Sequence, residues 1–596
     1  MKRSTEIIIL AAIIVLGAGL RGLYLAEIVK QPDFANPGID ASYHDYWARA
    51  LITGDWSKPK MYPDPMIEST PYFRAPGYPY FLAFIYAVSG SSYLWARLAQ
   101  MLLGLASVLL AFKLGKRWFG SGIGLVFAAL MAVYWGFIYF EGELLEPVLL
   151  VILALGLVYA LSLWVEKVSF KRSLAVGLLL GLYALVRPNI LPFGAVALAW
   201  AWWIVRGKQG LGAFKKAALG LILGTLLMVL PATVRNYLVA DDLVLIASSG
   251  GVNLYIGNNS LSDGFTACPP NMPRWTSHDY PRIVEDLSRQ MGRPLKQSEA
   301  SALFSKAAVK FMVDNPGREI RLIVKKALLF WGPLEVGNEK EDELERKASR
   351  VLGSIPLTFP LVLSLAVLGA GMLIGEVRSR APKKELGGAE IERRRQVFVL
   401  IVLFIAVYFL GYLPFFVAGR FRVPIIPFLL LLAALGLARI GRILARKDFR
   451  SIPYWAFLWL IAFGLAITNF AGYRPNVAGW HYGEGTAWLT TGHEEEAIRH
   501  FRSAIRVNPE YADAYVNLGI ALRNQGKTDE AIEAYREAIR IRPNIAEGHN
   551  YLAVALYFKG GYAEAWREVH LAEQYGATPH PDFLENLSRK MPEPEE

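Results

Sequence analysis

The sequence predicts an all-α protein in which a polytopic membrane domain precedes a C-terminal α-solenoid. Of the 596 residues, 54% are hydrophobic and 19% are charged, whereas soluble globular domains average about 25% charged residues. Apolar runs of roughly 17–22 residues recur up to about residue 475, and each is long enough to cross the ~30 Å hydrocarbon core of a bilayer. From about residue 478 the chain is polar and repetitive. We therefore expect a transmembrane domain at 1–475 and a repeat domain at 478–596.

The apolar runs predict about eleven transmembrane helices. The first run follows a basic amino terminus, but Arg21 interrupts its end and no small-residue cleavage site follows, so it predicts an uncleaved span rather than a signal peptide. The apolar stretch 77–88 is too short to cross a bilayer and predicts an interfacial helix. The expected spans are 5–25, 91–112, 121–140, 146–165, 172–189, 190–206, 217–236, 353–375, 396–415, 421–438 and 453–471.

The charges between these runs predict how the membrane domain is oriented. Basic residues gather in alternate loops, which the positive-inside rule assigns to the cytoplasm. The loops 26–90 and 237–352, the turn 141–145 and the repeat domain then lie at the extracytoplasmic face of a bacterial or archaeal type of cell membrane. Because the net charge of +12 falls mostly in the cytoplasmic loops, it does not indicate a nucleic-acid partner. The single cysteine, Cys268, excludes an intrachain disulfide.

Residues 482–576 repeat with a period of 34 residues. The repeated small residues let two antiparallel helices approach closely, and the repeated glycines permit the turn between them. This period resembles that of tetratricopeptide repeats, about three of which stack into a superhelix with a concave face. That face is predicted to bind a peptide, a partner protein or the protein's own acceptor substrate; the alternative is a solvated packing module. The aligned positions are Gly485, Gly519 and Ala553, then Gly492, Gly526 and Gly560.

Charged side chains gather at the edge of the membrane domain, on the predicted outer face. Charges in such places are costly to hold and are therefore functional candidates. Because they come from distant loops that share one membrane face, we expect them to build one site. The candidates are Asp40, His44, Asp45, Arg74, Glu141, Glu143, Arg187, Arg420 and Arg422.

The order of several of these segments is similar to that in a known family. The first outer loop carries Asp40 with Tyr43-His44, and it is followed by Arg74-Ala75-Pro76-Gly77-Tyr78-Pro79, Gly257-Asn258-Asn259 and Gly419-Arg420-Phe421-Arg422-Val423-Pro424. Over about residues 1–440 the chain resembles the GT-C fold glycosyltransferases, specifically the family 39-like group of protein mannosyltransferases and the aminoarabinose transferase of lipid A. The resemblance implies an enzyme that takes a sugar from a polyprenyl-phosphate-linked donor at the outer face.

The resemblance also implies a catalytic aspartate in the first outer loop, and the matching residue is Asp40. A carboxylate can take the proton of an acceptor hydroxyl as that oxygen attacks the anomeric carbon. We predict that Glu141 and Glu143 act as further catalytic carboxylates, which orient the acceptor or bind a cation. The structural alternatives are an N-cap role for Asp40 and solvated turn positions for the two glutamates.

Arginines on the same face are candidates for binding the donor phosphate. A planar guanidinium matches phosphate oxygens and stabilises the charge that develops on the leaving group. The alternative is that these arginines anchor helix ends among lipid headgroups. The predicted substrate-binding residues are His44, Asp45, Arg74, Arg187, Arg420 and Arg422.

The cofactor requirement is left open by the sequence. It contains no Walker loop and no dinucleotide fingerprint, which fits a lipid-linked donor rather than a nucleotide. A divalent cation could be held by oxygen and nitrogen atoms, although no HxxxH or CxxC spacing supports a metal site. The side chains that could supply ligands are Asp40, His44, Glu68, Glu141 and His278.

Two other functions are compatible with the same features. An O-antigen ligase or polymerase type of enzyme can also carry such repeats, although its key loop tends to come late in the chain. A non-enzymatic membrane scaffold would use the repeats to recruit partners. A transporter is less favoured because the charges gather on one face rather than at the midplane. The sequence does not name the sugar, and a protein, a glycan and a lipid all remain possible acceptors.

Overall fold

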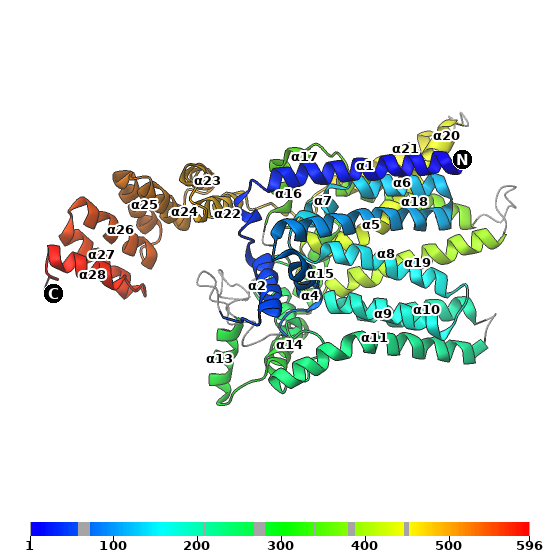
Figure 1. Cartoon of the computed structure of the whole chain (residues 1–596), viewed down its shortest axis with the longest axis horizontal. Helices are drawn as coiled ribbons and strands as arrows, with labels where there is room; N and C mark the ends of the chain where they lie inside the picture. The colour runs from blue at the N-terminus through cyan, green and yellow to red at the C-terminus, as the bar shows by residue number, and fades with distance from the viewer. Residues whose placement is uncertain are drawn as a thin grey trace. The chain divides into compact units, whose positions relative to one another are not determined.

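The computed structural model describes residues 2–57, 72–206, 210–267, 280–338, 340–378, 388–445 and 452–594. Helices and their connecting loops make up these ranges, and no β-strand occurs in them, so the predicted all-α fold class is confirmed. The chain folds into two compact units. One comprises residues 1–29 and 37–473, and the other residues 30–36 and 474–596 (Figure 1).

Eight helices of the first unit are long and apolar enough to cross a membrane within the described ranges, and a ninth follows if one bent pair is counted. Each of the eleven predicted segments corresponds to a helix, but α9 (Phe170–Val186) and α21 (Ile452–Ile467) are only 17 and 16 residues long. The eight are α1 (Arg3–Ile28), α5 (Tyr93–Phe119), α8 (Pro147–Trp164), η2 with α10 (Pro188–Val205), α11 (Gly210–Ala240), α18 (Phe359–Arg378), α19 (Gly388–Tyr412) and η4 with α20 (Gly419–Ala445).

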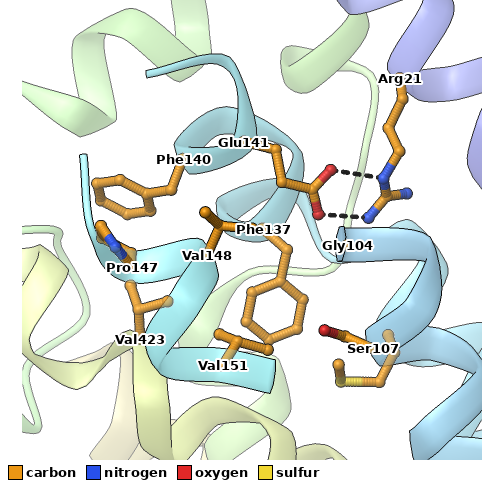
Figure 2. Close-up of a pocket in the computed structure, with 11 residues that line it drawn as sticks. Arg21, Gly104, Ser107, Phe137, Phe140, Glu141, Pro147, Val148, Val151 and Val423 are labelled. Carbon is orange, nitrogen blue, oxygen red and sulfur yellow. Dashed lines mark hydrogen bonds and ion pairs between the residues drawn. The ribbon is translucent and has the colours of Figure 1, made fainter. Parts of the chain in front are cut away.

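The bent pair brings a polar turn into the helix bundle. It consists of α6 (Ser121–Val133) and α7 (Trp135–Gly142), which meet at an angle of 48°. Glu141, in the last turn of α7, forms a two-pronged ion pair with Arg21 of α1 (Figure 2). Gly104 of α5 leaves the space for this pair, because a Cβ atom there would lie 1.9 Å from Glu141 Oε1.

Shorter helices gather at one end of the bundle in Figure 1. The apolar stretch predicted to be interfacial forms α4 (Gly77–Ser89), which packs against α2 (Ile39–Thr53). Buried aromatic side chains of both helices, including Tyr43, Trp47 and Tyr78, join the main hydrophobic core. The other short helices are α12 (Gly250–Gly257), α13 (Tyr280–Met291), α14 (Gln297–Asp314), α15 (Pro316–Phe330), α16 (Asp342–Ala348) and α17 (Arg350–Gly353).

The second unit contains three helical hairpins, as the 34-residue period predicts. Gly519 gives the clearest reason for the small residues, because a Cβ there would lie 2.4 Å from the Tyr535 ring. The turn glycine Gly526 has a φ of +79°, in the region that favours glycine. The hairpins are α22 (Val477–Thr490) with α23 (Glu494–Val507), α24 (Ala512–Asn524) with α25 (Thr528–Ile541), and α26 (Ala546–Lys559) with α27 (Tyr562–Gln574), followed by α28 (Pro581–Lys590).

Candidate active site

The carboxylate of Asp40 lies in the first turn of α2, between two arginines from distant parts of the chain. Arg74 pairs with its Oδ1 atom, and Arg420 Nη2 donates a hydrogen bond to Oδ2 at 2.6 Å. The Arg74 guanidinium also stacks on the Tyr43 ring. Gly38 rather than Asp40 occupies the N-cap position of α2, and no side chain caps that helix end. The structure therefore brings three predicted site residues together and does not support the N-cap alternative.

Glu146 provides a second buried carboxylate beside this cluster. It pairs with Arg187, and its Oε2 atom lies 3.8 Å from His44 Nε2. Burial lowers the pKa of His44, against the opposing effect of the Glu146 carboxylate, which favours the neutral imidazole. The Phe421 ring contacts both groups of charges, with the guanidiniums of Arg187 and Arg420 at 5.1 and 5.8 Å from its centroid. Glu146 was not among the predicted site residues, although a carboxylate at the first residue of the predicted span 146–165 was a usable signal.

The charges of this cluster do not cancel. Three guanidiniums, those of Arg74, Arg187 and Arg420, face the two carboxylates of Asp40 and Glu146. With a neutral imidazole beside them, one positive charge is left over at a largely buried place. Low surrounding polarity strengthens the field of such a charge. The cluster is therefore suited to bind an anion with a single negative charge.

Arg422 does not join the Asp40 cluster. It pairs with Glu335 through two nitrogens, at 2.7 and 2.9 Å, and donates to the carbonyl oxygens of Phe330, Gly332 and Leu334. These contacts tie η4 (Gly419–Ile425) to the segment that follows α15. In the structure, groups of the protein surround the Arg422 guanidinium. The predicted contact between Arg422 and a donor phosphate is not tested by these contacts and stays a prediction.

Asp45 also faces away from the cluster. Tyr86 and Tyr93 donate hydrogen bonds to its carboxylate at 2.6 and 3.0 Å, and Arg49 pairs with it at 3.0 Å. These partners come from α2, α4 and α5, so Asp45 joins three helices. Its predicted role in substrate binding is not tested by these contacts.

Glu141 and Glu143 have separate surroundings, although only Gly142 lies between them. Glu141 is buried against Arg21 in an apolar cavity (Figure 2). Glu143 pairs with Lys340 at 3.0 Å. Gln100 fixes the turn by donating to the carbonyl oxygens of both glutamates, at 2.9 and 2.7 Å. Of the two predicted carboxylates, only Glu143 therefore lies on the side of the Asp40 cluster.

A pocket of about 540 Å³, its open mouth included, adjoins this cluster. Arg420 lines it, together with Gly38 and Ala41 on either side of Asp40 in the sequence. One wall of the pocket is polar and is formed by Asn338, Lys340 and Asp342. Sequence reasoning missed this polar wall, although the charged run 339–343 in the second long outer loop was an available signal. The remaining lining residues are Tyr139, Phe140, Glu143, Leu145, Val336 and Ala418.

Asp342, in the pocket wall, should make the stability of the protein depend on pH. Burial raises its pKa well above the ordinary range, and the Glu335 carboxylate acts in the same direction. The contribution of Asp342 to stability is fully present below the unfolded pKa of about 3.9, and it is lost as the pH rises toward the folded pKa. Asp342→Asn, which can still accept the hydrogen bond of Tyr139, should therefore raise the unfolding temperature at pH 8 more than at pH 4.5. Thermal unfolding in detergent measures this, and an equal shift at both pH values would contradict it.

Within the part of the chain that the structure describes, no group of three or more His, Cys, Asp or Glu side chains is placed to hold a metal ion. Two residues that the sequence offered as ligands, Glu68 and His278, lie outside the described residues, as does Cys268. The need for a divalent cation thus stays open.

Comparisons with known protein families match two separate stretches of the chain. Residues 73–234 match the family described as dolichyl-phosphate-mannose-protein mannosyltransferase, and residues 482–546 and 519–569 match the tetratricopeptide repeat family. No curated protein matches the chain.

Solved structures match the chain at low similarity. MamA is 29% identical over 22% of this chain and 72% of its own, with a TM-score of 0.17. The apo oligosaccharyltransferase of Archaeoglobus fulgidus is 14% identical over 83% of this chain and 60% of its own, with a TM-score of 0.41. The archaeal oligosaccharyltransferase AglB from Archaeoglobus fulgidus, in complex with an inhibitory peptide and a dolichol-phosphate, is 11% identical over 82% and 58%, with a TM-score of 0.42.

These findings bear on the resemblance predicted from the sequence. The stretch that matches the mannosyltransferase family includes Arg74, Glu141, Glu143 and Arg187. The several long apolar helices of this chain make it an integral membrane protein. The repeat match covers the hairpins α22 to α27. The resemblance is thereby confirmed: residues 73–234 are similar to the dolichyl-phosphate-mannose-protein mannosyltransferase family, and the C-terminal part carries tetratricopeptide repeats.

Proposed function

We propose that this chain transfers a sugar from a polyprenyl-phosphate-linked donor to a hydroxyl acceptor at the extracytoplasmic face, with Asp40 as the general base. The observation that carries the proposal is the Asp40 carboxylate held between Arg74 and Arg420, in a cluster with one positive charge left over. A phosphodiester linking a lipid and a sugar has one negative charge and would balance that excess. The match to a family described by its dolichyl-phosphate-mannose donor supports a lipid-linked substrate.

The ion pairs suggest how donor binding would activate the base. Without donor, both guanidiniums stabilise the charged form of Asp40, which makes it a weak base. A phosphate that accepts hydrogen bonds from Arg74 and Arg420 would weaken their hold on the carboxylate. Asp40 could then accept the acceptor's proton more readily, so the catalytic base would become effective when the donor is in place.

The reaction follows from these positions. The acceptor oxygen attacks the anomeric carbon while Asp40 takes its proton, and the bond between that carbon and the phosphate oxygen breaks. The bonding electrons leave with the lipid phosphate, whose charge the arginines stabilise. A direct displacement of this kind inverts the anomeric configuration.

Reconstitution tests the proposal. The full chain would be placed in vesicles with a panel of labelled polyprenyl-phosphate sugars, and donor consumption and product would be followed with peptide, glycan and lipid acceptors. We expect turnover of at least one donor. The family description favours a polypeptide acceptor. A reaction that uses only a lipid-diphosphate-linked glycan would favour the ligase or polymerase alternative, and no turnover of any donor would favour the scaffold.

Arg420→Gln should lower kcat/KM for the lipid-linked donor by about 10²- to 10³-fold, the range found when one preorganised donor to a developing charge is removed. Arg420→Lys should lie between this variant and the wild type, because an ammonium keeps the charge but loses the planar fork. Steady-state transfer in vesicles measures both variants. Arg536→Gln, at an exposed position of the repeats, is the matched control. Equal rates for Arg420→Gln and this control would rule out a phosphate contact by Arg420.

The repeat domain is expected to face the outside of the cell. In a Cys268→Ser background, a single cysteine at position 536 of the repeats should react with a membrane-impermeant maleimide in intact cells. A cysteine at position 167, in a predicted cytoplasmic loop, should react only after lysis. Both positions are exposed in their own units. The opposite labelling pattern would invert the predicted orientation.

A further inference from the structure

The pocket beside Asp40 shares one residue with the cluster that suits a phosphate. Arg420 donates to the Asp40 carboxylate and also lines the pocket. In a glycosyl phosphate the sugar is bonded directly to a phosphate oxygen. A donor whose phosphate contacts Arg420 would therefore place its sugar within reach of the pocket.

The walls of this pocket carry polar groups whose charges are compensated. Lys340 and Glu143 pair with each other at 3.0 Å. Asp342 is buried and accepts a hydrogen bond from Tyr139 at 3.2 Å. Burial raises the pKa of Asp342 well above its usual range, which favours the uncharged acid. Together with the amide of Asn338, these groups offer donors and acceptors without the excess positive charge of the neighbouring arginines.

The polar wall is anchored to the element that carries Arg420. Gly419 N donates to the carbonyl oxygen of Val336 at 2.8 Å. Tyr473 accepts a hydrogen bond from Gly337 N at 2.8 Å and donates one to Glu341 at 2.9 Å. These contacts hold Val336, Gly337 and Glu341 in one position relative to η4. The pocket is thus largely formed before a ligand arrives, which lowers the entropic cost of binding.

We infer that this pocket is the subsite for the glycosyl group of the donor, and that it selects an uncharged sugar over an amino sugar or a uronic acid. An uncharged sugar needs many hydrogen bonds and some apolar contact, which Asn338, Asp342 and the Lys340–Glu143 pair supply beside the rings of Tyr139 and Phe140. An ammonium or carboxylate on the sugar would have to disturb the existing pair. The inference rests on the proposed function, because it assumes a lipid-linked glycosyl donor.

Binding measurements on the full chain in lipid nanodiscs test this inference. The probes are a polyprenyl phosphate without sugar and the same lipid carrying a neutral hexose, an amino sugar or a uronic acid. Asn338→Ala should weaken binding of the neutral hexosyl lipid about tenfold, as expected for one lost hydrogen bond to a buried polar partner. It should leave binding of the bare lipid phosphate unchanged. Asn524→Ala, at an exposed position of the repeats, is the control.

Lys340→Met gives the sharper test, because it leaves the Glu143 carboxylate without its lysine partner. The preference should then shift toward the amino-sugar lipid by about tenfold or more, while the bare lipid phosphate binds as before. Gly38→Leu, at a pocket position where a Cβ meets no atom within 4 Å, should weaken all three glycosyl lipids and spare the bare one. Thermal unfolding of each variant separates these effects from loss of folding.

The outcomes distinguish the subsite from the proposed function. If the wild type transfers sugar but Asn338→Ala, Lys340→Met and Gly38→Leu change neither affinity nor preference, the subsite inference fails alone. If these variants impair an acceptor peptide instead of the glycosyl lipid, the pocket binds the acceptor and the inference is wrong. If the wild type turns over no glycosyl lipid at all, the proposed function itself fails.

Discussion

Asp40→Asn should lower the rate of sugar transfer by about 10²- to 10⁴-fold, the range expected for loss of a general base. The amide keeps nearly the same shape, and its carbonyl oxygen can still accept a hydrogen bond from Arg74 or Arg420, so the chain should insert and fold. It cannot take a proton from the acceptor hydroxyl. Transfer measured in vesicles at equal amounts of folded protein gives the rate.

The same variant should bind polyprenyl phosphate at least as tightly as the wild type. Loss of the Asp40 charge leaves the arginine cluster with two uncompensated positive charges instead of one, and it removes the carboxylate that competes for the guanidiniums. A titration of labelled polyprenyl phosphate measures the affinity. Weaker phosphate binding together with normal transfer would show that Asp40 serves to build the site and is not the base.

Asp55→Asn is the matched control for this experiment. Asp55 follows the C-terminal end of α2 and is exposed. Its substitution should leave both the transfer rate and the phosphate affinity unchanged. A scaffold without enzyme activity would give the same result for Asp40→Asn as for this control.

The largest effect on stability is expected at the Arg21–Glu141 pair. Arg21→Met and Glu141→Met should each destabilise the protein by about 3–5 kcal/mol, because each leaves one charge buried without its partner. The double variant should recover most of this loss, since the pair lies in an apolar cavity with Phe137, Val148 and Val151 (Figure 2). Thermal or denaturant unfolding in detergent measures the three variants as a cycle.

The double variant also tests the predicted catalytic role of Glu141. The glutamate is engaged with Arg21 at 2.6 and 2.7 Å, and it lines a different cavity from the one beside Asp40. We therefore expect the folded double variant to retain transfer. A stable but inactive double variant would instead establish that Glu141 takes part in the reaction. If the single variants are as stable as the wild type, the ion pair is not what holds α7 against α1.

Much of the fold could be predicted because it depends on local patterns. Apolar runs identify spanning helices from their length alone, and each of the eleven predicted segments is helical. The two shortest of these segments form α9 and α21, of 17 and 16 residues. At this length, the number of apolar residues alone does not decide whether a helix spans the bilayer. The repeats were predictable because each hairpin packs on its neighbours in sequence, so the glycine at position 519 already indicates a large residue near position 535.

The candidate site could be predicted only in part. Asp40, Arg74 and Arg420 were found because residue type and sidedness single them out, and their contact joins residues 380 positions apart. Glu146 and the wall formed by Asn338, Lys340 and Asp342 were missed. Such charges look like ordinary loop residues until the fold places them together.

The sequence by itself determined the helices, the repeats and the chemical types of side chain available at the outer face. The tertiary structure alone decided which charges meet. Glu141 and Glu143 are nearly adjacent, yet one faces Arg21 in the bundle and the other faces Lys340 in the pocket. The physical reason is that helix formation follows from interactions a few residues apart, whereas an ion pair depends on where distant backbones bring two side chains.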